Sequence, residues 1–593
     1  MPPRLQSSAL NREGDAILKY HLLHSSILQS RFAKLCVFMF LFCYVLNTLF
    51  SLHGGLWSRI LPFNALIFVI VLFPLLIFRK AKLAVVPKVE HSYFRYVVKA
   101  AFSSSTYQTL AVYSLCAFSE TLFLLWRSST NEVTIKPRSF EAARLNETYV
   151  YMRFFSFYMA FVYTIVHLVR SYDVLKFPST FKPPGPRILS RKYFLLGSSA
   201  VMALATTLTS PLVYLIFRRP LWLWSVHTAK IFYTLHYSES YYQFPFGIFL
   251  LGLCLYTSLF TFLTWEVCNF SFTVYMTLGP QHRGHYISEY SSQPNVTLIS
   301  GLYDDKRPLS QIVAFQELVL ISYEEKPTRR KSIFNDLDHK VPLWVEICNK
   351  CLEIMRQPLT TLRPPIKETQ NQLETTNLHV PPLHVPRIKL RSSQEVLKYK
   401  DNDRANRLLS ATQTTDPAIS KLVEEKISKL KVLLSKIQDS GTHFLTKIID
   451  QPIGLPFRQF LRFRSADIVA NPYLFTLSVY ALASFLIHSL EEDSVGIVQA
   501  DIPRILQSYC EVMNAMDQYL ADPPLHWADP DTKPGPVKPG KLENFESSLK
   551  AVASCLKDIL IELNPYLDDM DLDPEVWEQV RILRETMTEP TDI

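Results

Sequence analysis

The sequence lacks a disulfide framework. Its nine cysteines among 593 residues show no spacing typical of a small secreted domain. Five of them fall in or beside apolar runs, where cysteine behaves as a small hydrophobic residue: Cys36, Cys43, Cys116, Cys254 and Cys268. Cys348 and Cys351 form a C-x-x-C pair, but neither a preceding strand nor a second pair accompanies it. We therefore expect packed thiols here, and no metal or cofactor.

The sequence also has no continuous stripe of Lys and Arg. The formal net charge is +9, but residues 491–593 contain 22 Asp and Glu against 8 Lys and Arg, a local charge of −14, which leaves +23 for the rest. That basic surplus flanks apolar runs, as expected of charges that orient membrane spans. We therefore expect no direct contact with nucleic acid.

A cleavable signal peptide is not apparent at the beginning. Residues 1–30 are polar or mixed, and the first strong apolar run begins near Leu35. The first span is then expected to act as its own uncleaved signal. Runs of bilayer length predict six spans: Leu35–Leu52, Leu61–Phe78, Tyr107–Leu125, Tyr149–Val169, Tyr193–Phe217 and Phe244–Val267.

The short connections predict the orientation of these spans. Segments on the side of the N-terminus carry 17 Lys and Arg, and those on the opposite side carry 8. Because positive charge marks the cytosolic side, the N-terminus is expected in the cytosol. An even number of spans returns the chain to that side, so the C-terminus is expected there too. Asn146, in a sequon on the opposite side, is the expected glycosylation acceptor.

Two charges are recognised inside the apolar runs, Glu120 and Arg153. Both lie near the non-cytosolic ends of adjacent antiparallel spans, so they are expected at similar depth. A transport pathway usually needs several charges at mid-membrane depth, which favours a structural ion pair between these two residues. Ser199, Ala203 and Thr207 recur every four residues on the fifth span, which predicts close packing against another helix.

The rest of the chain predicts a helical domain interrupted by a flexible linker. Residues 1–30 form a cytosolic segment, 31–278 the six-span domain, 279–360 a cytosolic helical segment, 361–415 the linker and 416–593 a cytosolic α-helical domain. The linker is polar and contains "LHVPPLHVP", which favours extended polyproline geometry. The predicted fold class is therefore mainly α: a six-helix transmembrane bundle followed by a cytosolic α-helical domain with an internal disordered linker.

Aromatic and basic residues alternate in "LPFRQFLRFR". Such a mixture suits contact with an anionic membrane surface, and a basic face of a folded domain is the equal alternative. The residues are Phe457, Arg458, Phe460, Arg462, Phe463 and Arg464.

The run "ANPYLFTLSVYALASFLIHSL", residues 470–490, is long enough to cross a bilayer. Its polar residues make it poorer than the six spans, so a buried core helix is favoured. A seventh span, which would place the C-terminus in the lumen, remains the alternative.

At "SLEEDSVGIVQADIPRIL", Ser489–Leu506, the chain resembles the nuclear-division-cycle (Ndc) family of transmembrane nucleoporins. Six spans before a cytosolic half agree with it, as do "AFQELVLIS" from Ala314, "RRKSIFND" from Arg329 and "WVEICNKCLEI" from Trp344. The resemblance implies a fungal member of the nuclear envelope and endoplasmic reticulum membrane, without catalytic residues.

It further implies that the protein anchors nuclear pore complexes, contributes to pore assembly and, in fungi, to spindle pole body insertion. Expected partners are scaffold nucleoporins, other pore-membrane proteins, spindle pole body components and membrane lipids, with a homo-oligomer left open. The alternative is a polytopic transporter or lipid-modifying enzyme of the endoplasmic reticulum. That class requires clustered His, Asp or Glu at a membrane face, which we do not find in the sequence.

Overall fold

The structure is a computed structural model. The residues described are 19–50, 68–87, 89–125, 132–135, 143–178, 180–235, 247–336, 339, 341–362, 457–524, 529, 535–538, 540–570 and 572–588. The expected linker beyond Leu362 and the expected helix after Asp416 lie outside these residues.

Contacts divide the chain into two units. The first comprises Met1–Leu362, Leu461–Pro523 and Gly535–Ile593, and it holds nearly all described residues. Of the second, Arg363–Phe460 and Pro524–Pro534, only 457–460, 524 and 529 are described.

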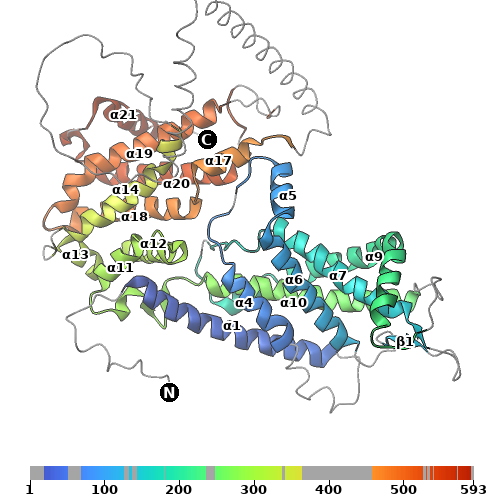
Figure 1. Ribbon diagram of the computed structural model, residues 1–593. Helices are drawn as coiled ribbons and strands as arrows, with labels where there is room; N and C mark the ends of the chain where they lie inside the picture. The colour runs from blue at the N-terminus through green and yellow to red at the C-terminus, as the bar shows by residue number, and fades with distance from the viewer. Residues whose placement is uncertain are drawn as a thin grey trace, which may run out of the picture. The chain divides into compact units, whose positions relative to one another are not determined.

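The first unit is mainly helical (Figure 1). Its N-terminal helical group contains α1 (Tyr20–Phe50), the π-helical turn η1 (Phe68–Leu72), α4 (Phe73–Ala81), α5 (Tyr93–Ala101), α6 (Ser104–Leu124), α7 (Glu147–Val169), α8 (Pro184–Leu189), α9 (Lys192–Ala229) and α10 (Ile248–Met276). The two-residue strands β1 (Thr134–Ile135) and β2 (Arg144–Leu145) pair antiparallel just before α7.

The C-terminal helical group follows a second small antiparallel pair, β3 (Gln281–His282) and β4 (His285–Tyr286). It contains η3 (Ser288–Tyr290), α11 (Pro294–Leu302), α12 (Pro308–Ser322), α13 (Thr328–Phe334), α14 (Leu343–Leu362), α17 (Leu461–Ile468), α18 (Pro472–Glu492), α19 (Ile497–Ala521), α20 (Glu543–Leu563), η5 (Leu567–Asp569) and α21 (Pro574–Thr588). Within it, α18 packs against α12, α14 and α20.

Five helices of the described residues are long and apolar enough to cross a membrane: α1, α7, α9, α10 and α18. The prediction of a mainly α-helical chain with several apolar helices is confirmed. Of the other two expected spans, α6 matches the third in position, and η1 with α4 covers the end of the second, whose residues 61–67 lie outside the described part.

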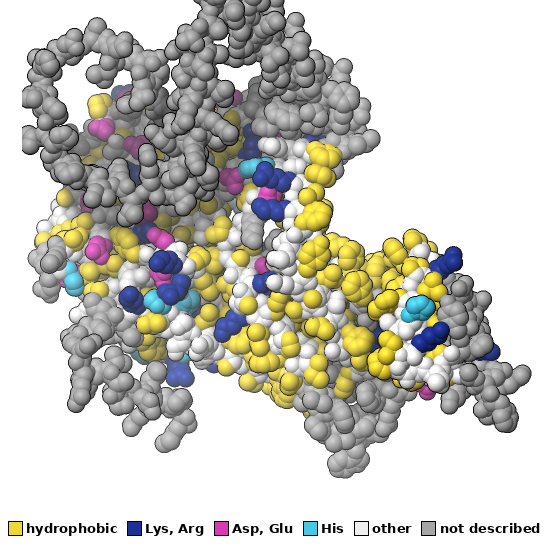
Figure 2. Space-filling view, in the orientation of Figure 1, with side chains coloured by type: hydrophobic (Ala, Val, Ile, Leu, Met, Phe, Trp, Pro, Cys, Tyr) yellow, Lys and Arg dark blue, Asp and Glu magenta, His cyan; other side chains and the backbone are white. Residues whose placement is uncertain are grey.

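The apolar helices differ in what surrounds them. Along α9, one face is buried and the opposite face exposes Val201, Leu208 and Ile216, which are 69%, 64% and 74% exposed. Figure 2 shows hydrophobic side chains gathered over α6, α7 and α9. In α18, by contrast, 67% of the most apolar window is buried inside the protein, against 28% in α9. The faces of α9 suit a lipid solvent, whereas α18 has protein on most sides.

Local sequence explains where several helices begin. Asn471 caps α18, because its side-chain oxygen accepts the backbone N–H of Leu474 at 3.2 Å, and Pro472 occupies the first turn. Pro308 likewise starts α12. One start was not expected: α1 begins at Tyr20 and runs without a break into the first apolar run, through part of the segment assigned to residues 1–30.

Candidate functional site

The turn between α18 and α19 is built around a single carboxylate. Asp493 Oδ1 accepts the backbone N–H groups of Val495 and Gly496 at 3.1 and 2.8 Å, and its Oδ2 accepts that of Val498 at 2.8 Å. Gly496 has a φ of 79°, in the left-handed region that favours glycine. The "DSVG" of the sequence, residues 493–496, is therefore a helix-capping turn that sets the direction of α19.

The glutamate just before this turn makes a two-point ion pair. Arg330 of α13 donates from Nε to Glu492 Oε2 at 2.9 Å and from Nη2 to Oε1 at 2.7 Å. Its Nη1 also donates to carbonyl oxygens at the end of α12 and beyond, among them that of Ser322 at 3.2 Å. Both side chains are almost fully buried, at 3% and 10% exposure. This pair joins α12, α13 and α18 at one point.

A second motif residue meets the start of α19. Trp344 of α14 is fully buried and donates from its indole Nε1 to Asp501 Oδ2 at 3.0 Å. Its ring lies among those of Phe334 and Phe485, with centroids 6.0 Å away in both cases. The three sequence stretches that carried the family resemblance after Ala314, Arg329 and Trp344 thus converge on the fourth, at Ser489–Leu506.

A buried carboxylate, that of Glu317, connects α1 to the C-terminal helical group. Glu317 of α12 accepts a hydrogen bond from the Tyr20 hydroxyl at 2.9 Å, and Ser288 and Arg329 also contact it. Burial raises the pKa of Glu317, against the opposing effects of Ser288 and Arg329. The first turn of α1 is therefore held inside the C-terminal helical group.

Two further contacts extend this joint. Arg31, further along α1, donates to the carbonyl oxygens of Leu278 and Gly279 at 2.8 and 2.6 Å. Gly301 of α11 has no room for a side chain, since a Cβ there would lie 2.7 Å from Tyr20 Cγ. The helix that continues into the first apolar run is thus packed directly on α11 and α12, without a flexible connection.

A polar network lies where α7 and α10 approach each other. Glu266 of α10 accepts from the hydroxyls of Tyr163 and Tyr172 at 3.1 and 2.8 Å, and Arg170 Nη1 lies 3.0 Å from its other oxygen. Glu266 was not among the charges recognised in the sequence, because it lies at the end of an apolar run. A carboxylate inside the sixth expected span was the available signal.

The expected intramembrane pair consists of Glu120 on α6 and Arg153 on α7. Both oxygens of Glu120 are buried without a hydrogen-bond partner among the described residues, and no ion pair with Arg153 forms there. The Arg153 guanidinium instead lies over the rings of Phe118 and Tyr149, at 5.0 and 4.9 Å from their centroids. The two charges lie on adjacent helices, but their pairing stays a prediction. An unforeseen pair occurs nearby, between Arg218 and Glu147, at 2.6 Å.

The other expected sites of the N-terminal group are placed as follows. Ser199, Ala203 and Thr207 are buried on one face of α9, and the Thr207 hydroxyl lies 3.3 Å from that of Ser258 on α10. Asn146 caps α7, is 4% exposed, and donates from Nδ2 to the Glu132 carbonyl oxygen at 2.9 Å. Because Asn146 is buried, its amide is hardly accessible to a glycan, so glycosylation of Asn146 stays a prediction that this burial opposes.

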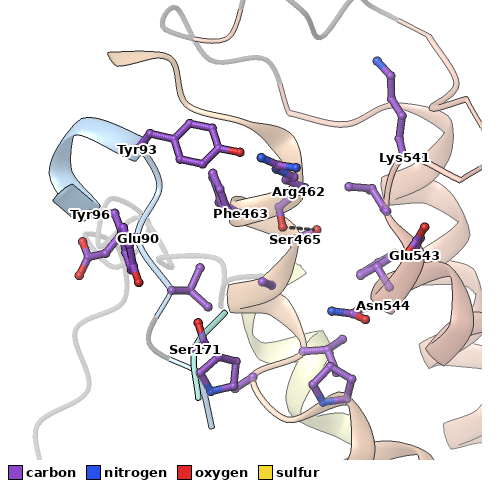
Figure 3. A pocket seen from close by; sticks show the side chains of 18 of the residues that line it. Glu90, Tyr93, Tyr96, Ser171, Arg462, Phe463, Ser465, Lys541, Glu543 and Asn544 are labelled. Carbon is purple, nitrogen blue, oxygen red and sulfur yellow. Dashed lines mark hydrogen bonds between the residues drawn. The ribbon is translucent and has the colours of Figure 1, made fainter. Parts of the chain in front are cut away.

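A groove of about 740 Å³ lies between α5, α17 and the start of α20 (Figure 3). The aromatic and basic residues of α17 form one wall. Phe463 packs edge to face on Tyr93 of α5, with centroids 5.3 Å apart, and the Arg462 guanidinium lies 5.3 Å from the Tyr93 ring. Of the residues expected at a membrane surface, these two therefore contact α5. Lipid contact by Phe457–Arg464 stays a prediction.

The C-x-x-C pair lies inside α14. Cys348 and Cys351 are both buried, and burial raises the pKa of the Cys348 thiol to about 12 and that of Cys351 well above its usual range. No group of three or more His, Cys, Asp or Glu side chains fit to hold a metal ion occurs in the described part of the chain.

Taken together, long apolar helices with an exposed hydrophobic face and a second helical group joined to them by the hydrogen bonds of Tyr20 and Arg31 define a polytopic membrane protein. The family model described as Nucleoporin protein Ndc1-Nup matches residues 26–581. The chain belongs to this nucleoporin family, and the resemblance noted in the sequence is confirmed.

Two fungal relatives support the assignment. The nuclear envelope protein ndc1 of Schizosaccharomyces pombe is 23% identical over 595 residues, which cover 95% of this chain and 96% of that protein. The nucleoporin NDC1 of Chaetomium thermophilum is 25% identical over 361 residues, 55% of each chain.

Proposed function

We propose that this nucleoporin is an integral anchor of nuclear pore complexes in the nuclear envelope. Six spans, contributed by α1, the segment ending in α4, α6, α7, α9 and α10, hold the protein in the membrane. The C-terminal helical group is the cytosolic platform that binds scaffold nucleoporins and other pore-membrane proteins. Tethering to a membrane converts weak contacts into effectively intramolecular ones, which suits a role without a catalytic centre.

The observation that carries the proposal is the rigid joint between span and platform. Tyr20 of α1 makes a buried hydrogen bond to Glu317, and Arg31 makes a partly buried one to the segment after α10. A platform fixed in this way is held at a set distance from the bilayer. A domain on a flexible tether would serve recruitment but would not set the distance of its partners from the membrane.

The burial of α18 supports a cytosolic location for both termini. A helix already surrounded by α12, α14 and α20 would have to leave these contacts to meet lipid. A core helix satisfies its polar side chains inside the protein, as Ser484 does with the carbonyl oxygen of Ser322 at 2.7 Å. With six spans, both termini lie on the side where the connections carry more Lys and Arg. In a fungal cell, the same platform would contribute to pore assembly and to insertion of spindle pole bodies.

Localisation and depletion test this function. The full chain fused to a fluorescent protein is expected to give a punctate nuclear rim that coincides with pore complexes, and depletion is expected to reduce the number of pores. Re-expression of the unaltered chain should restore them. A diffuse reticular signal together with unchanged pores after depletion would contradict the proposal.

A further inference from the structure

Helix α5 has an exposed apolar face. None of its nine residues is buried. Val98 and Phe102, one helical turn apart, are 38% and 80% exposed, and Phe94, one turn earlier, is 46% exposed. Exposed apolar side chains at this spacing form one stripe along the helix. An exposed apolar stripe of this kind marks a contact with a membrane or with another protein.

Two basic residues border the stripe. Arg95 and Lys99 also lie one turn apart, and their side chains are 70% and 65% exposed. Both contact the carboxylate of Glu90, with Arg95 Nε 3.2 Å from Glu90 Oε2. An apolar face flanked by exposed Lys and Arg is the pattern of a helix that lies in the plane of a membrane surface. The carboxylate of Glu90 opposes binding of an anion at this point.

The position of α5 along the membrane normal follows from its contact with α7. The Tyr96 hydroxyl donates to the carbonyl oxygen of Leu168 at 2.9 Å, one residue before α7 ends. The last residue of α7, Val169, is 73% exposed. Helix α5 is thus held level with the end of an apolar helix, on the side where the positive charges of the connections gather.

The apolar surface is also continuous. Figure 2 shows the hydrophobic side chains of α5 meeting those that cover α6 and α7. At the start of α6, Tyr107 is 57% exposed. A protein partner that covered only α5 would leave the apolar surface of α6 and α7 uncovered. A bilayer around α6 and α7 would cover that surface and the stripe of α5 together.

We propose that α5 is an interfacial helix embedded in the cytosolic leaflet, where Arg95 and Lys99 bind the headgroups of anionic phospholipids. Val98 and Phe102 enter the boundary between headgroups and acyl chains. Tyr93 and Tyr96 face the other way, toward the groove and α7. The inference rests on the proposed spans α6 and α7.

Photocross-linking of the full chain tests the placement. The photoreactive amino acid p-benzoylphenylalanine replaces Phe102 in protein reconstituted into vesicles of phosphatidylcholine with phosphatidylserine, and mass spectrometry identifies the adducts. Leu208, on the exposed face of α9, is the site expected to meet lipid if the spans are correct, and Tyr566, 53% exposed after α20, is the matched aqueous site. Lipid adducts are expected at positions 102 and 208 and not at 566.

These sites separate two failures. Lipid adducts at position 208 with protein adducts or none at 102 would overturn the interfacial helix and leave the spans intact. Absence of lipid adducts at both positions would overturn the spans as well.

Charge substitutions test the headgroup. In the Arg95→Gln/Lys99→Gln variant, the ratio of phosphatidylserine to phosphatidylcholine adducts at position 102 is expected to fall about fivefold for each cation removed. Glu90→Gln removes the competing carboxylate and should raise that ratio. Ratios unchanged in both variants would show that Arg95 and Lys99 only hold Glu90, which would overturn anionic lipid binding.

Discussion

Arg330 and Glu492 are 162 residues apart in sequence and form a buried two-point ion pair, with Nη2 to Oε1 at 2.7 Å and Nε to Oε2 at 2.9 Å. The pair fastens α13 to the end of α18 just where the turn into α19 begins. Because Arg330 also donates to the carbonyl oxygens of Ser322, the last residue of α12, and of Glu324, one side chain of α13 binds the ends of both α12 and α18.

Removing one partner of this pair should destabilise the C-terminal helical group. Arg330→Met leaves the Glu492 carboxylate buried and unpaired, which costs about 3–5 kcal/mol in the free energy of unfolding. Chemical unfolding in detergent measures this change. Arg581→Gln is the matched control, because Arg581 and Glu578 are 56% and 55% exposed, and its cost should stay below about 1 kcal/mol. An equal decrease in the free energy of unfolding in the two variants would show that the buried pair stabilises the protein no more than an exposed pair does.

The contact between Tyr20 and Gly301 predicts a second effect. Gly301→Ala places a Cβ 2.7 Å from Tyr20 Cγ and 2.9 Å from Ala314 Cβ, so α1 has to move away from α11. Overpacking of this kind costs about 1–3 kcal/mol. Gly185→Ala makes the same change where no atom lies within 4 Å. Limited proteolysis should cut the beginning of α1 faster in Gly301→Ala alone, and equal cutting in the two variants would contradict the rigid joint.

Glu317 predicts a pH dependence of stability. Because burial raises its pKa in the folded state, the folded protein holds this proton more tightly than the unfolded chain. The resulting stabilisation is complete below the unfolded value of about 4.5 and is lost as pH rises through the raised folded value. Glu317→Gln cannot titrate. The melting temperature of the unaltered protein, measured against that of Glu317→Gln, should therefore fall from pH 5 to pH 8, and a constant or rising difference would contradict this assignment.

The buried cysteine pair predicts low thiol reactivity. The raised pKa values of Cys348 and Cys351 keep both sulfurs protonated at neutral pH, and the packing of α14 covers them. Alkylation with iodoacetamide, located by peptide mass spectrometry, should leave both unmodified in the native protein and modify both after denaturation. Rapid native labelling of either cysteine would indicate an accessible redox or metal-binding pair instead.

The sequence predicts what is local in this fold. Runs of apolar residues locate the helices, and Asn471 with Pro472 marks the start of α18, because capping depends only on near neighbours. The pairing of Arg330 with Glu492, and of Trp344 with Asp501, depends on how distant helices pack, so composition and spacing do not reveal it. The motifs carrying the resemblance pointed to the right segments without indicating that they touch.

The boundaries of the apolar runs explain the remaining differences. Tyr20 and His24 are buried on α1, but they lie in a mixed stretch that hydropathy does not separate from a polar segment. Glu266 was assigned to no role because one charge at the end of a long run hardly lowers its mean hydropathy. The amphipathic character of α5 was missed because a nine-residue helix is shorter than a window of bilayer length.

Protease access in sealed microsomes tests the central claim, that the helices after α10 form a platform on the cytosolic side. A tag at the C-terminus should be digested by protease added outside, whereas a tag inserted between α6 and α7 should remain protected until detergent opens the vesicles. Protection of the C-terminal tag in intact vesicles would place α18 across the membrane and contradict the account.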